Sequence, residues 1–408
     1  MKRASQIACI VHCVLLAHFC SRAICAQPSE PVVARVQMQL KTGDQVIGVI
    51  ERGDLLTVVE EQKDAYIILT LNGKRGLLNK ANVSTVADSV ELYDELIREK
   101  PNDGRLLTLR ASAWWVRGDA KKALADYDRA IEAGYDEPHV YSSRGMLRAA
   151  LGEEDKAIAD LNKAIENGAK DDLAHLSRAT VYMTQKKFPL ALKDYDEAIR
   201  RNPKKAGNYQ QRAVARKIAG QLDGAIEDFG KAIELEPKRV SAWMGRGFVW
   251  FQKDESAKAI ADFSEAIKLD PKAAAAYNNR GYNRQLLKDE KNALEDFEMA
   301  ISLAPNYGLA YQNKAWLLAT SNDAQLRDGK KAVEAATKAC ELCDYKDVSD
   351  VKALAAALAE SGEFGKAIGW QEKVIEMVPD DEKPSERQAL EKFKAKQPLR
   401  FDDQTAAK

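Results

Sequence analysis

The chain has no excess of charge of either sign and contains few histidine and cysteine residues. Its 408 residues include 62 Lys and Arg, 62 Asp and Glu, four His and six Cys. A balanced charge gives no reason to expect nucleic acid or a membrane surface as a partner. Four of the cysteines lie in the first 26 residues, which leaves Cys340 and Cys343. The rest of the chain is therefore not a scaffold held together by disulfide bonds.

The chain also lacks the residue groups that catalysis and metal binding need. The only histidines after residue 26 are His139 and His175, so Cys340-x-x-Cys343 has no second pair of ligands for a metal ion. A Gly-rich phosphate loop, a nucleophile elbow and a His-Glu-x-x-His motif are all missing from the sequence. We therefore predict a protein that is not an enzyme, with no cofactor, no metal and two buried, inert thiols.

Long hydrophobic runs are absent, apart from a short one at the start. Lys2 and Arg3 precede an apolar run over residues 7–20, and small residues follow up to Ala26. This order is typical of a secretory signal peptide, and the apolar run is too short to span a membrane comfortably. We predict a signal peptide over residues 1–26, export, and no membrane-spanning segment in the mature chain. The alternative is a buried N-terminal helix.

Residues 33–86 contain short β-type runs separated by turn signals. The runs cover residues 46–50, 55–59 and 66–71, and Gly-Asp or Asn-Gly pairs lie between them. About 50 residues suffice for one small all-β barrel. From Gly43-Asp44 to Gly76-Leu77-Leu78 the stretch resembles a bacterial SH3-like domain, although Leu77 stands where that family usually has Trp. The resemblance implies either attachment to cell-wall peptide or packing against a neighbouring domain, and we favour packing.

A motif with a period of 34 residues occupies most of the remaining chain. Ala191, Ala225, Ala259 and Ala293 are each followed by Tyr or Phe after four residues, Ala after seven and Pro after twelve. Spacings of four and three place these residues on one face of a helix, and the proline ends that helix. A fixed period of this length predicts a solenoid.

When these alanines are numbered position 20, the other positions also repeat. Position 8 is small, position 4 is usually large and aromatic, and several units have Gly at position 15. The pattern resembles the tetratricopeptide repeat, which implies a mainly α fold, a right-handed superhelix of helix pairs. We assign residues 88–380 to a leading half-repeat and about eight repeats, the seventh with five extra residues. Residues 381–408 follow as a capping helix (385–394) and a tail, which we expect to be loose from residue 397.

Arginine and aspartate occur together in the first six repeats. Position 7 is Arg and position 23 is Asp in each of them, whereas both are replaced in the seventh and eighth. We predict a bidentate Arg–Asp ion pair within each of these six repeats, with a structural role.

The tetratricopeptide resemblance implies that the first helix of each repeat lines a concave face. Apolar residues gather at the inward positions of repeats five to seven, and two asparagines stand beside them. An exposed apolar patch of this kind usually marks an interaction site. The candidate partner-binding residues are Met244, Phe248, Phe251, Asn279, Tyr282, Asn313 and Trp316. The alternative is that tighter coiling or the inserted residues cover the aromatic side chains.

These observations predict an exported bacterial scaffold, periplasmic or secreted, that binds a partner protein or peptide on its concave face. The two asparagines would bond the backbone of an extended peptide, as in peptide-binding members of the family. The alternative is a structural protein of the cell envelope. Its SH3-like module would dock on cell-wall peptide, and its repeats would form an assembly platform.

Overall fold

A computed structural model describes residues 31–42, 45–69, 75–169 and 172–401. The predicted signal peptide lies outside these residues. The described residues form two compact units, one up to Asn202 (unit 1) and one from Pro203 (unit 2).

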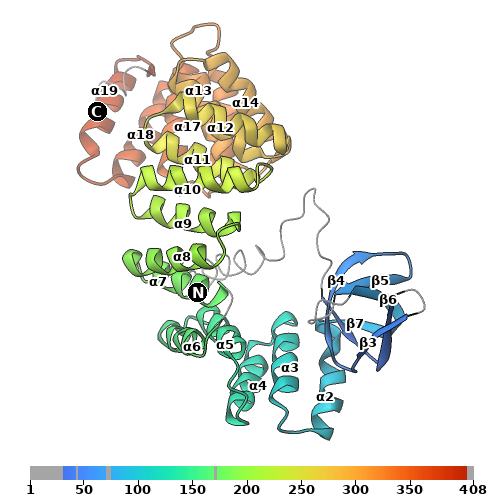
Figure 1. The fold of residues 1–408 in the computed structure, drawn as a ribbon. Helices are drawn as coiled ribbons and strands as arrows, with labels where there is room; N and C mark the ends of the chain where they lie inside the picture. Colours follow the sequence, from blue (N-terminus) through green and yellow to red (C-terminus); the bar gives the residue numbers. More distant parts are fainter. Residues whose placement is uncertain (1–30, 43–44, 70–74, 170–171, 402–408) are drawn as a thin grey trace. The chain divides into compact units, whose positions relative to one another are not determined.

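Unit 1 begins with an antiparallel sheet of seven strands in the order β3-β2-β6-β5-β4-β1-β7 (Figure 1). Alternate residues point to its two faces, so Leu56, Val58, Ile68 and Leu78 are buried in one core. The predicted β-type runs 46–50 and 55–59 fall in β3 and β4, and residues 66–69 of the third run fall in β5, whereas its residues 70–71 lie outside the described residues. The strands are β1 (Val32–Ala34), β2 (Met38–Thr42), β3 (Gln45–Ile50), β4 (Leu55–Glu61), β5 (Ala65–Leu69), β6 (Arg75–Asn79) and β7 (Val83–Thr85).

The sheet is attached to the first helices of unit 1. Tyr93 of α2 (Val90–Glu99) is fully buried, and its hydroxyl donates a hydrogen bond to the carbonyl oxygen of Gly53 (3.1 Å). Gly53 has a φ of 86°, and a Cβ atom there would lie 2.7 Å from the Leu96 side chain. Asp54 forms an ion pair with Arg105 of α3 (Gly104–Val116), over 2.6 Å. Residue 53 must therefore be glycine, because its backbone is left-handed and the Leu96 side chain leaves no room for a Cβ atom.

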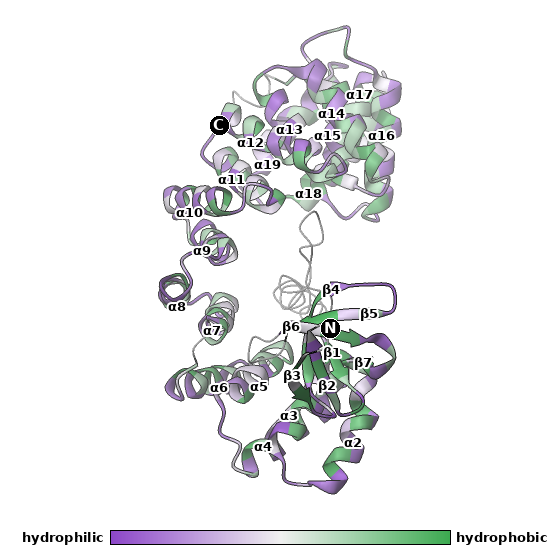
Figure 2. Ribbon diagram, turned by 45° about the vertical axis from the view of Figure 1, so that its right-hand side comes forward, coloured by the Kyte–Doolittle hydropathy of each residue, from purple (hydrophilic) through white to green (hydrophobic). Residues whose placement is uncertain are grey.

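The predicted solenoid is confirmed: the described residues contain eighteen α-helices, of which α3 to α18 follow one another in eight pairs, between the single helices α2 and α19. Hydrophobic and hydrophilic residues alternate along these helices (Figure 2), as expected for amphipathic helices. Unit 1 has α3 (Gly104–Val116), α4 (Ala120–Glu132), α5 (Pro138–Ala150), α6 (Glu154–Glu166), α7 (Leu173–Thr184) and α8 (Phe188–Arg201). Unit 2 has α9 (Ala206–Ile218), α10 (Leu222–Leu235), α11 (Val240–Gln252), α12 (Ser256–Leu269), α13 (Ala274–Leu286), α14 (Glu290–Leu303), α15 (Gly308–Thr320), α16 (Gly329–Leu342), α17 (Val348–Glu360), α18 (Phe364–Met377) and α19 (Lys383–Lys394).

Small residues at position 8 allow the two helices of a pair to lie close together. A Cβ atom added to Gly247 would lie 2.9 Å from the ring of Phe263, and one added to Gly281 would lie 2.9 Å from the ring of Phe297. Both rings are fully buried. The aromatic residue at position 24 therefore fills the space that the small residue leaves.

The turn inside seven of the eight helix pairs uses a left-handed residue at position 15, and the α15–α16 pair, which carries the insertion, is the exception. Gly118, Gly152, Gly220 and Gly362 have φ values between 77° and 85°, as the turn chemistry predicts. Three repeats adopt the same conformation without glycine: the φ values of Lys186, Asp254 and Lys288 are 57°, 58° and 62°. The repeat therefore imposes this turn even where the local residue disfavours it.

The predicted Arg–Asp pairs are confirmed in all six repeats. In each, Nε and Nη2 of the arginine donate to the two carboxylate oxygens over 2.6–3.0 Å, and 13–23 % of the arginine side chain is exposed. The pairs are Arg110–Asp126, Arg144–Asp160, Arg178–Asp194, Arg212–Asp228, Arg246–Asp262 and Arg280–Asp296.

The same arginines also connect successive repeats, which sequence reasoning missed. Nη1 of Arg110 donates to Asp94 (2.7 Å) and Nη1 of Arg144 to Asp128 (2.7 Å), and both acceptors lie at position 25 of the preceding unit. Arg246 of the fifth repeat faces Gly230 at this position of the fourth repeat. Glycine has no side-chain acceptor, so the corresponding contact of Arg246 is missing.

The end of unit 2 is built differently, from a continuous apolar core. Residues 353–359 of α17 are all buried, and α17 packs against both α15 and α16. The segment expected to be a loose tail returns to this core as far as Phe401. Leu399 is buried, Arg400 pairs with Glu360 (2.8 Å), and the Phe401 amide donates to the Thr320 carbonyl (2.8 Å). Glu360 also pairs with Arg327 (3.1 Å), so it joins the five-residue insertion to the tail.

The two cysteines lie in this core region. Cys340 is fully buried, and burial raises the pKa of its thiol to about 12. Cys343 is only partly buried, contrary to the prediction of two buried thiols, and its thiol donates to the Cys340 carbonyl oxygen (3.3 Å). Because the Cys340 thiolate is strongly disfavoured, this thiol is unreactive at neutral pH.

Candidate partner-binding site

Three of the predicted residues form one aromatic cluster on α11 and α13 of unit 2. The rings of Phe248 and Phe251 lie 5.9 Å apart at an angle of 64°, and those of Phe251 and Tyr282 lie 5.6 Å apart at 87°. Edge-to-face contacts of this kind are favourable because the positive edge of one ring meets the negative face of the next. We call Phe248, Phe251 and Tyr282 the aromatic cluster.

The aromatic cluster is only partly covered by the protein. Phe248 and Tyr282 are each 38 % exposed, and Phe251 between them is partly buried. Phe248 and Phe251 are three residues apart on one helix and therefore share a face, whereas Tyr282 comes from the first helix of the next repeat. Large aromatic side chains that contact one another yet remain this exposed offer a surface for another molecule.

Lys217 of α9 adds one positive charge to the cluster. Its ammonium group lies 4.8 Å from the centre of the Phe248 ring, which is a cation–π contact. Burial lowers the pKa of Lys217 below its usual value, and no carboxylate pairs with it within the described part of the chain. Sequence reasoning missed this residue, although it occupies position 12, one of the inward positions.

Exposed aliphatic side chains extend the apolar surface on α9 and α13. Val214 is 37 %, Ile218 is 55 % and Leu286 is 38 % exposed, and they occupy inward positions 9 and 13. Sequence reasoning considered the aromatic residues and overlooked these three, although the same position rule identifies them. We call Val214, Ile218, Phe248, Phe251, Tyr282 and Leu286 the inner stripe.

Met244 and Asn279 lie on the same two helices as the aromatic cluster. Met244 is one turn before Phe248 on α11 and is partly buried. Asn279 is also partly buried, and its side-chain oxygen accepts a hydrogen bond from Asn278 (3.3 Å). Its main-chain carbonyl accepts from Asn283 (2.9 Å).

Asn313 and Trp316 of α15 have different surroundings. Asn313 is only 7 % exposed and donates a hydrogen bond to Asn278 (2.9 Å), so this amide hydrogen is already used inside the protein. Trp316 packs against the C-terminal core that contains Phe393 and Leu399. The structure therefore places these two residues outside the aromatic cluster.

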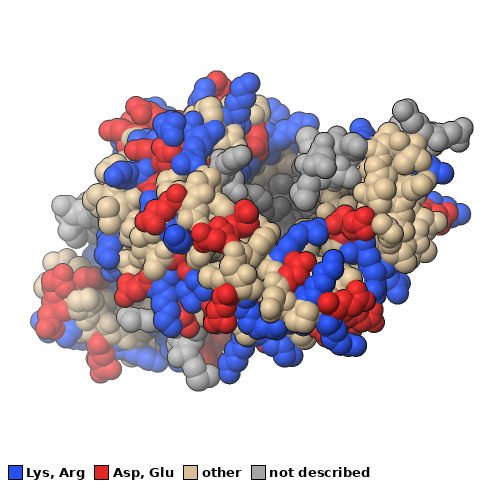
Figure 3. All heavy atoms as spheres, turned by 60° about the horizontal axis from the view of Figure 1, so that its bottom comes forward, with Lys and Arg blue, Asp and Glu red and all other residues tan. Residues whose placement is uncertain are grey.

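The inner stripe offers apolar contact, and Lys217 beside it adds one positive charge. Within the described ranges, no three His, Cys, Asp or Glu side chains are arranged to hold a metal ion. Elsewhere on the surface, charges of both signs are interspersed on the face that Figure 3 shows. None of the helices in the described ranges combines the length and the apolar character needed to cross a bilayer.

Comparison with known proteins identifies the repeats. Sequence models of the tetratricopeptide repeat match residues 84–138, 142–206, 212–274 and 274–307, together just over half of the chain. No curated protein matches the chain significantly as a sequence.

Among solved structures, the C-terminal part of a repeat-containing protein from Cytophaga hutchinsonii is similar over 60 % of this chain and 98 % of its own, with 18 % identity and a TM-score of 0.51. A tetratricopeptide repeat protein from Parabacteroides merdae is similar over 56 % of this chain and 91 % of its own (22 % identity, TM-score 0.43). YrrB, described as having an unusual peptide-binding site, is similar over 46 % and 97 % (22 % identity, TM-score 0.40). At these identities the likeness concerns the fold.

Proposed function

The chain belongs to the tetratricopeptide repeat family, and on this premise we propose that it is a non-catalytic scaffold that binds a protein or peptide along its inner stripe. The exposed aromatic cluster is the observation that carries this proposal. Aromatic residues dominate the binding energy of protein interfaces because they bury a large apolar area at a small loss of side-chain freedom.

Lys217 adds a polar requirement to the apolar surface. Its ammonium group is partly desolvated above Phe248 and has no carboxylate partner within the described residues. A partner that places an acidic group beside an apolar side chain would satisfy both features. Binding of such a group would favour the charged form of Lys217 and raise its pKa again.

A partner pull-down with the full chain tests the inner stripe. We expect that Phe248→Ala/Tyr282→Ala removes the crosslinked partner, because each side chain contributes about 2 kcal/mol or more where an aromatic anchor is buried in an interface. Met299→Ala is the matched control, since Met299 is 44 % exposed and lies on α14, the second helix of its repeat. An unchanged partner set in the double variant would show that the inner stripe is not the binding surface.

For location, we propose that residues 1–26 direct export of a bacterial protein to the periplasm or the medium. The signal-like order of charge, apolar run and small residues supports this proposal. N-terminal sequencing of the exported protein tests it: a mature chain that begins at Gln27 is expected, and retention of residues 1–26 would contradict it.

The second candidate function is a structural role in the cell envelope, with the sheet as an SH3-like module that docks on cell-wall peptide. An exposed apolar face of the sheet favours it: Val46, Val49 and Leu77 are 47 %, 56 % and 55 % exposed. The register places Val46 and Leu77 opposite Lys41 from either side, so they share this face. Sedimentation with isolated cell wall separates the two functions, because only the second predicts loss of binding in Val49→Ser/Leu77→Ser.

A further inference from the structure

Four repeats contain an aromatic ring over the guanidinium group of the Arg–Asp pair. The ring comes from position 4 and the arginine from position 7 of the same helix, one turn later. The distances from ring centre to guanidinium carbon are 5.7, 5.9, 5.0 and 5.5 Å. The four pairs are Tyr141–Arg144, Tyr209–Arg212, Trp243–Arg246 and Tyr277–Arg280.

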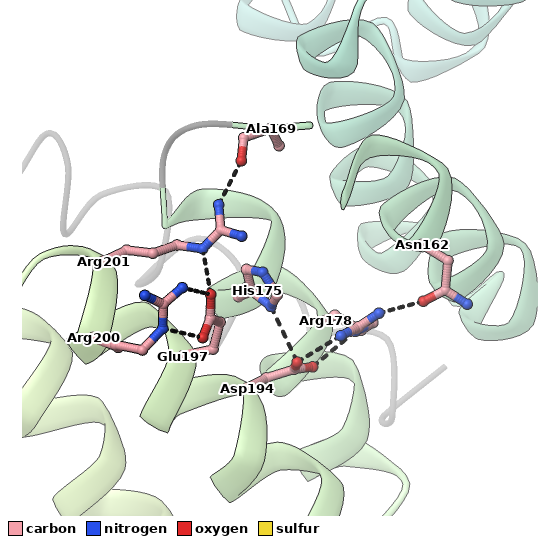
Figure 4. A network of polar contacts seen from close by, with 8 residues as sticks. All are labelled: Asn162, Ala169, His175, Arg178, Asp194, Glu197, Arg200 and Arg201. Carbon is pink, nitrogen blue, oxygen red and sulfur yellow. Dashed lines mark hydrogen bonds and ion pairs between the residues drawn. The ribbon is translucent and has the colours of Figure 1, made fainter. Parts of the chain in front are cut away.

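Like the first repeat, whose position 4 is Leu107, the third repeat has the arginine without the ring. Its position 4 is His175, whose Nδ1 lies 3.2 Å from Oδ1 of Asp194 (Figure 4). A carboxylate only accepts hydrogen bonds, so Nδ1 carries the hydrogen and the imidazole is held toward Asp194. The guanidinium group of Arg178 donates to Asp194 and Asn162, and no aromatic ring is recorded over it within the described ranges.

The substitution of histidine for tyrosine has a structural cost. Nε2 of His175 is buried and has no hydrogen-bond partner in the part of the chain that the structure describes. A buried polar atom without a partner destabilises the folded state, and the imidazole fills less space than a phenol ring. Packing alone would therefore favour tyrosine over histidine at position 4 of the third repeat.

A hollow lies beside His175 and Arg178. Its volume is about 440 Å³, and side chains of α7 and α8 line it: His175, Arg178, Lys193, Asp194, Asp196, Glu197 and Arg200. Two cations of the lining are already paired: Arg178 with Asp194 (2.6 Å) and Arg200 with Glu197 (2.7 Å) (Figure 4).

Lys193 contributes the remaining positive charge of the lining. It is exposed on α8, next to Asp194 in the chain, and no carboxylate within the described residues pairs with it. Burial by itself would raise the pKa of Asp194, but hydrogen bonds from Arg178 and His175 outweigh this effect and lower the pKa. This carboxylate is therefore charged at neutral pH, and both of its oxygen atoms already accept hydrogen bonds. The hollow thus contains the guanidinium group of Arg178, which has no ring stacked on it within the described residues, and the unpaired ammonium group of Lys193. Asp196, the third carboxylate of the lining, is engaged in an interaction of its own.

We propose that this hollow binds an aromatic ring that carries a carboxylate a few bonds away. The ring lies over the guanidinium group of Arg178, in the arrangement that four other repeats build from their own side chains. The carboxylate pairs with the ammonium group of Lys193. A free aromatic acid and an aromatic residue beside an acidic one in a partner both supply this chemistry. The hollow is formed by α7 and α8 of unit 1, whereas the inner stripe lies on α9, α11 and α13 of unit 2.

Arginine Nε–Hε resonances of the full ¹⁵N-labelled chain test the proposal, with 3-phenylpropanoate and acetyl-Phe-Asp-amide as probes. A ring stacked on a guanidinium group shifts the Hε resonance of that arginine upfield. We expect this shift for Arg178, identified by its loss in Arg178→Lys, and not for Arg144. The probe 3-cyclohexylpropanoate should bind roughly tenfold more weakly, because it lacks the π face. Binding of the dipeptide alone would identify a partner protein as the source, and binding of the free acid alone a small molecule.

Two variants separate the ring from the carboxylate. His175→Tyr restores the side chain of the other repeats, so it should fold, shift the Arg178 Hε resonance without any probe and abolish binding. Lys193→Gln should weaken binding of 3-phenylpropanoate roughly tenfold and leave binding of the neutral 3-phenylpropanamide unchanged. Lys187→Gln, at the exposed lysine in the N-cap position of α8, should change neither. Unaltered binding in His175→Tyr, equal shifts of all arginines, or no binding of either probe overturns the proposal.

Discussion

Tyr282 and Trp316 occupy the same position of successive repeats, yet their surroundings differ. Tyr282 is 38 % exposed beside Phe251, whereas Trp316 packs against the core of the last helices. The repeats around Tyr282 each contain an internal Arg–Asp pair, and their first helices keep apolar side chains exposed. After Trp316 the pairs stop, since Lys314 and Leu354 replace the arginines, and the buried helix α17 and the C-terminal segment close the inner side.

The comparison shows two ways of holding helix pairs together in one chain. A buried ion pair is directional and needs only small residues around it, so the inner face of the helix stays available. An apolar core becomes more stable with each apolar surface that it buries. Helices α17 and α19 and the C-terminal segment therefore pack onto this core and cover the inner side of the last repeats. In unit 2, the helix pairs with Arg–Asp ion pairs therefore leave inward apolar side chains available to a partner, and we call them the open part. The last helices cover theirs and form the closed part.

The largest effect is expected when an ion pair of the open part is broken. In Asp262→Ala the guanidinium group of Arg246, with 23 % of its side chain exposed, loses the carboxylate that holds it. Leaving such a charge unpaired destabilises by about 3–5 kcal/mol, seen as a lower urea midpoint. Glu265→Ala on the same helix is the control, since that side chain is 44 % exposed and should change the midpoint little. Equal midpoints would mean that the pairs contribute nothing.

The closed part should open when its C-terminal contacts are removed. Leu399→Ala/Arg400→Ala deletes a buried side chain and the ion pair with Glu360, and we expect a loss of about 2–4 kcal/mol. The ¹⁹F resonance of 5-fluorotryptophan at position 316, assigned by Trp316→Phe, should then move toward the solvent-exposed value. A resonance that does not move would show that α17 alone covers Trp316.

A substitution at Gly230 should restore the missing contact between the fourth repeat and Arg246 of the fifth. A Cβ atom there would lie 3.7 Å from Nη1 of Arg246, an ordinary contact, and Asp occupies the corresponding position before Arg110 and Arg144. Gly230→Asp should stabilise unit 2 by about 1 kcal/mol or slightly more, because it replaces a glycine inside a helix and adds an acceptor. Gly230→Ala measures the helix contribution alone, and an equal gain in both variants would exclude a contribution from the ion pair.

The smallest effect is expected at the left-handed turn residues. Lys288 adopts a φ of 62° where other repeats have glycine. Lys288→Gly should stabilise the protein by about 0.5–1 kcal/mol, because the strain outweighs the added freedom of the unfolded chain. Lys291→Gly, inside α14, is the opposite control and should destabilise the protein by about 1 kcal/mol. A loss of stability in Lys288→Gly would contradict this account.

The fold was predictable because its signals are local and repeated. The period of 34, the small residue at position 8 and the proline at position 32 each act within one helix pair, so they determine the same structure each time. The Arg–Asp pairs were predictable for the same reason: Arg212 and Asp228 are 16 residues apart within one repeat. Their additional bonds between repeats were not, because position 25 varies from Asp to Asn, Ser and Gly.

The candidate site was only partly predictable. The position rule correctly brings Phe248, Phe251 and Tyr282 together, since neighbouring first helices repeat the same geometry. It fails to separate Trp316 from them, because Leu399 and Phe393, which belong to the core around Trp316, lie about 80 residues later in the chain. Lys217 was missed because an inward lysine becomes notable only when the Phe248 ring is found beneath it.

The amino-acid sequence by itself determined the paired helices, their turns and the ion pairs within them, because each depends on residues a few turns apart. The tertiary structure alone decided which inward side chains are available to a partner. Availability depends on what covers a surface, and the covering segments come from elsewhere in the chain. The same distinction holds at His175: the missing aromatic residue is visible in the sequence, but the hollow beside Arg178 becomes visible only when α7 and α8 lie side by side.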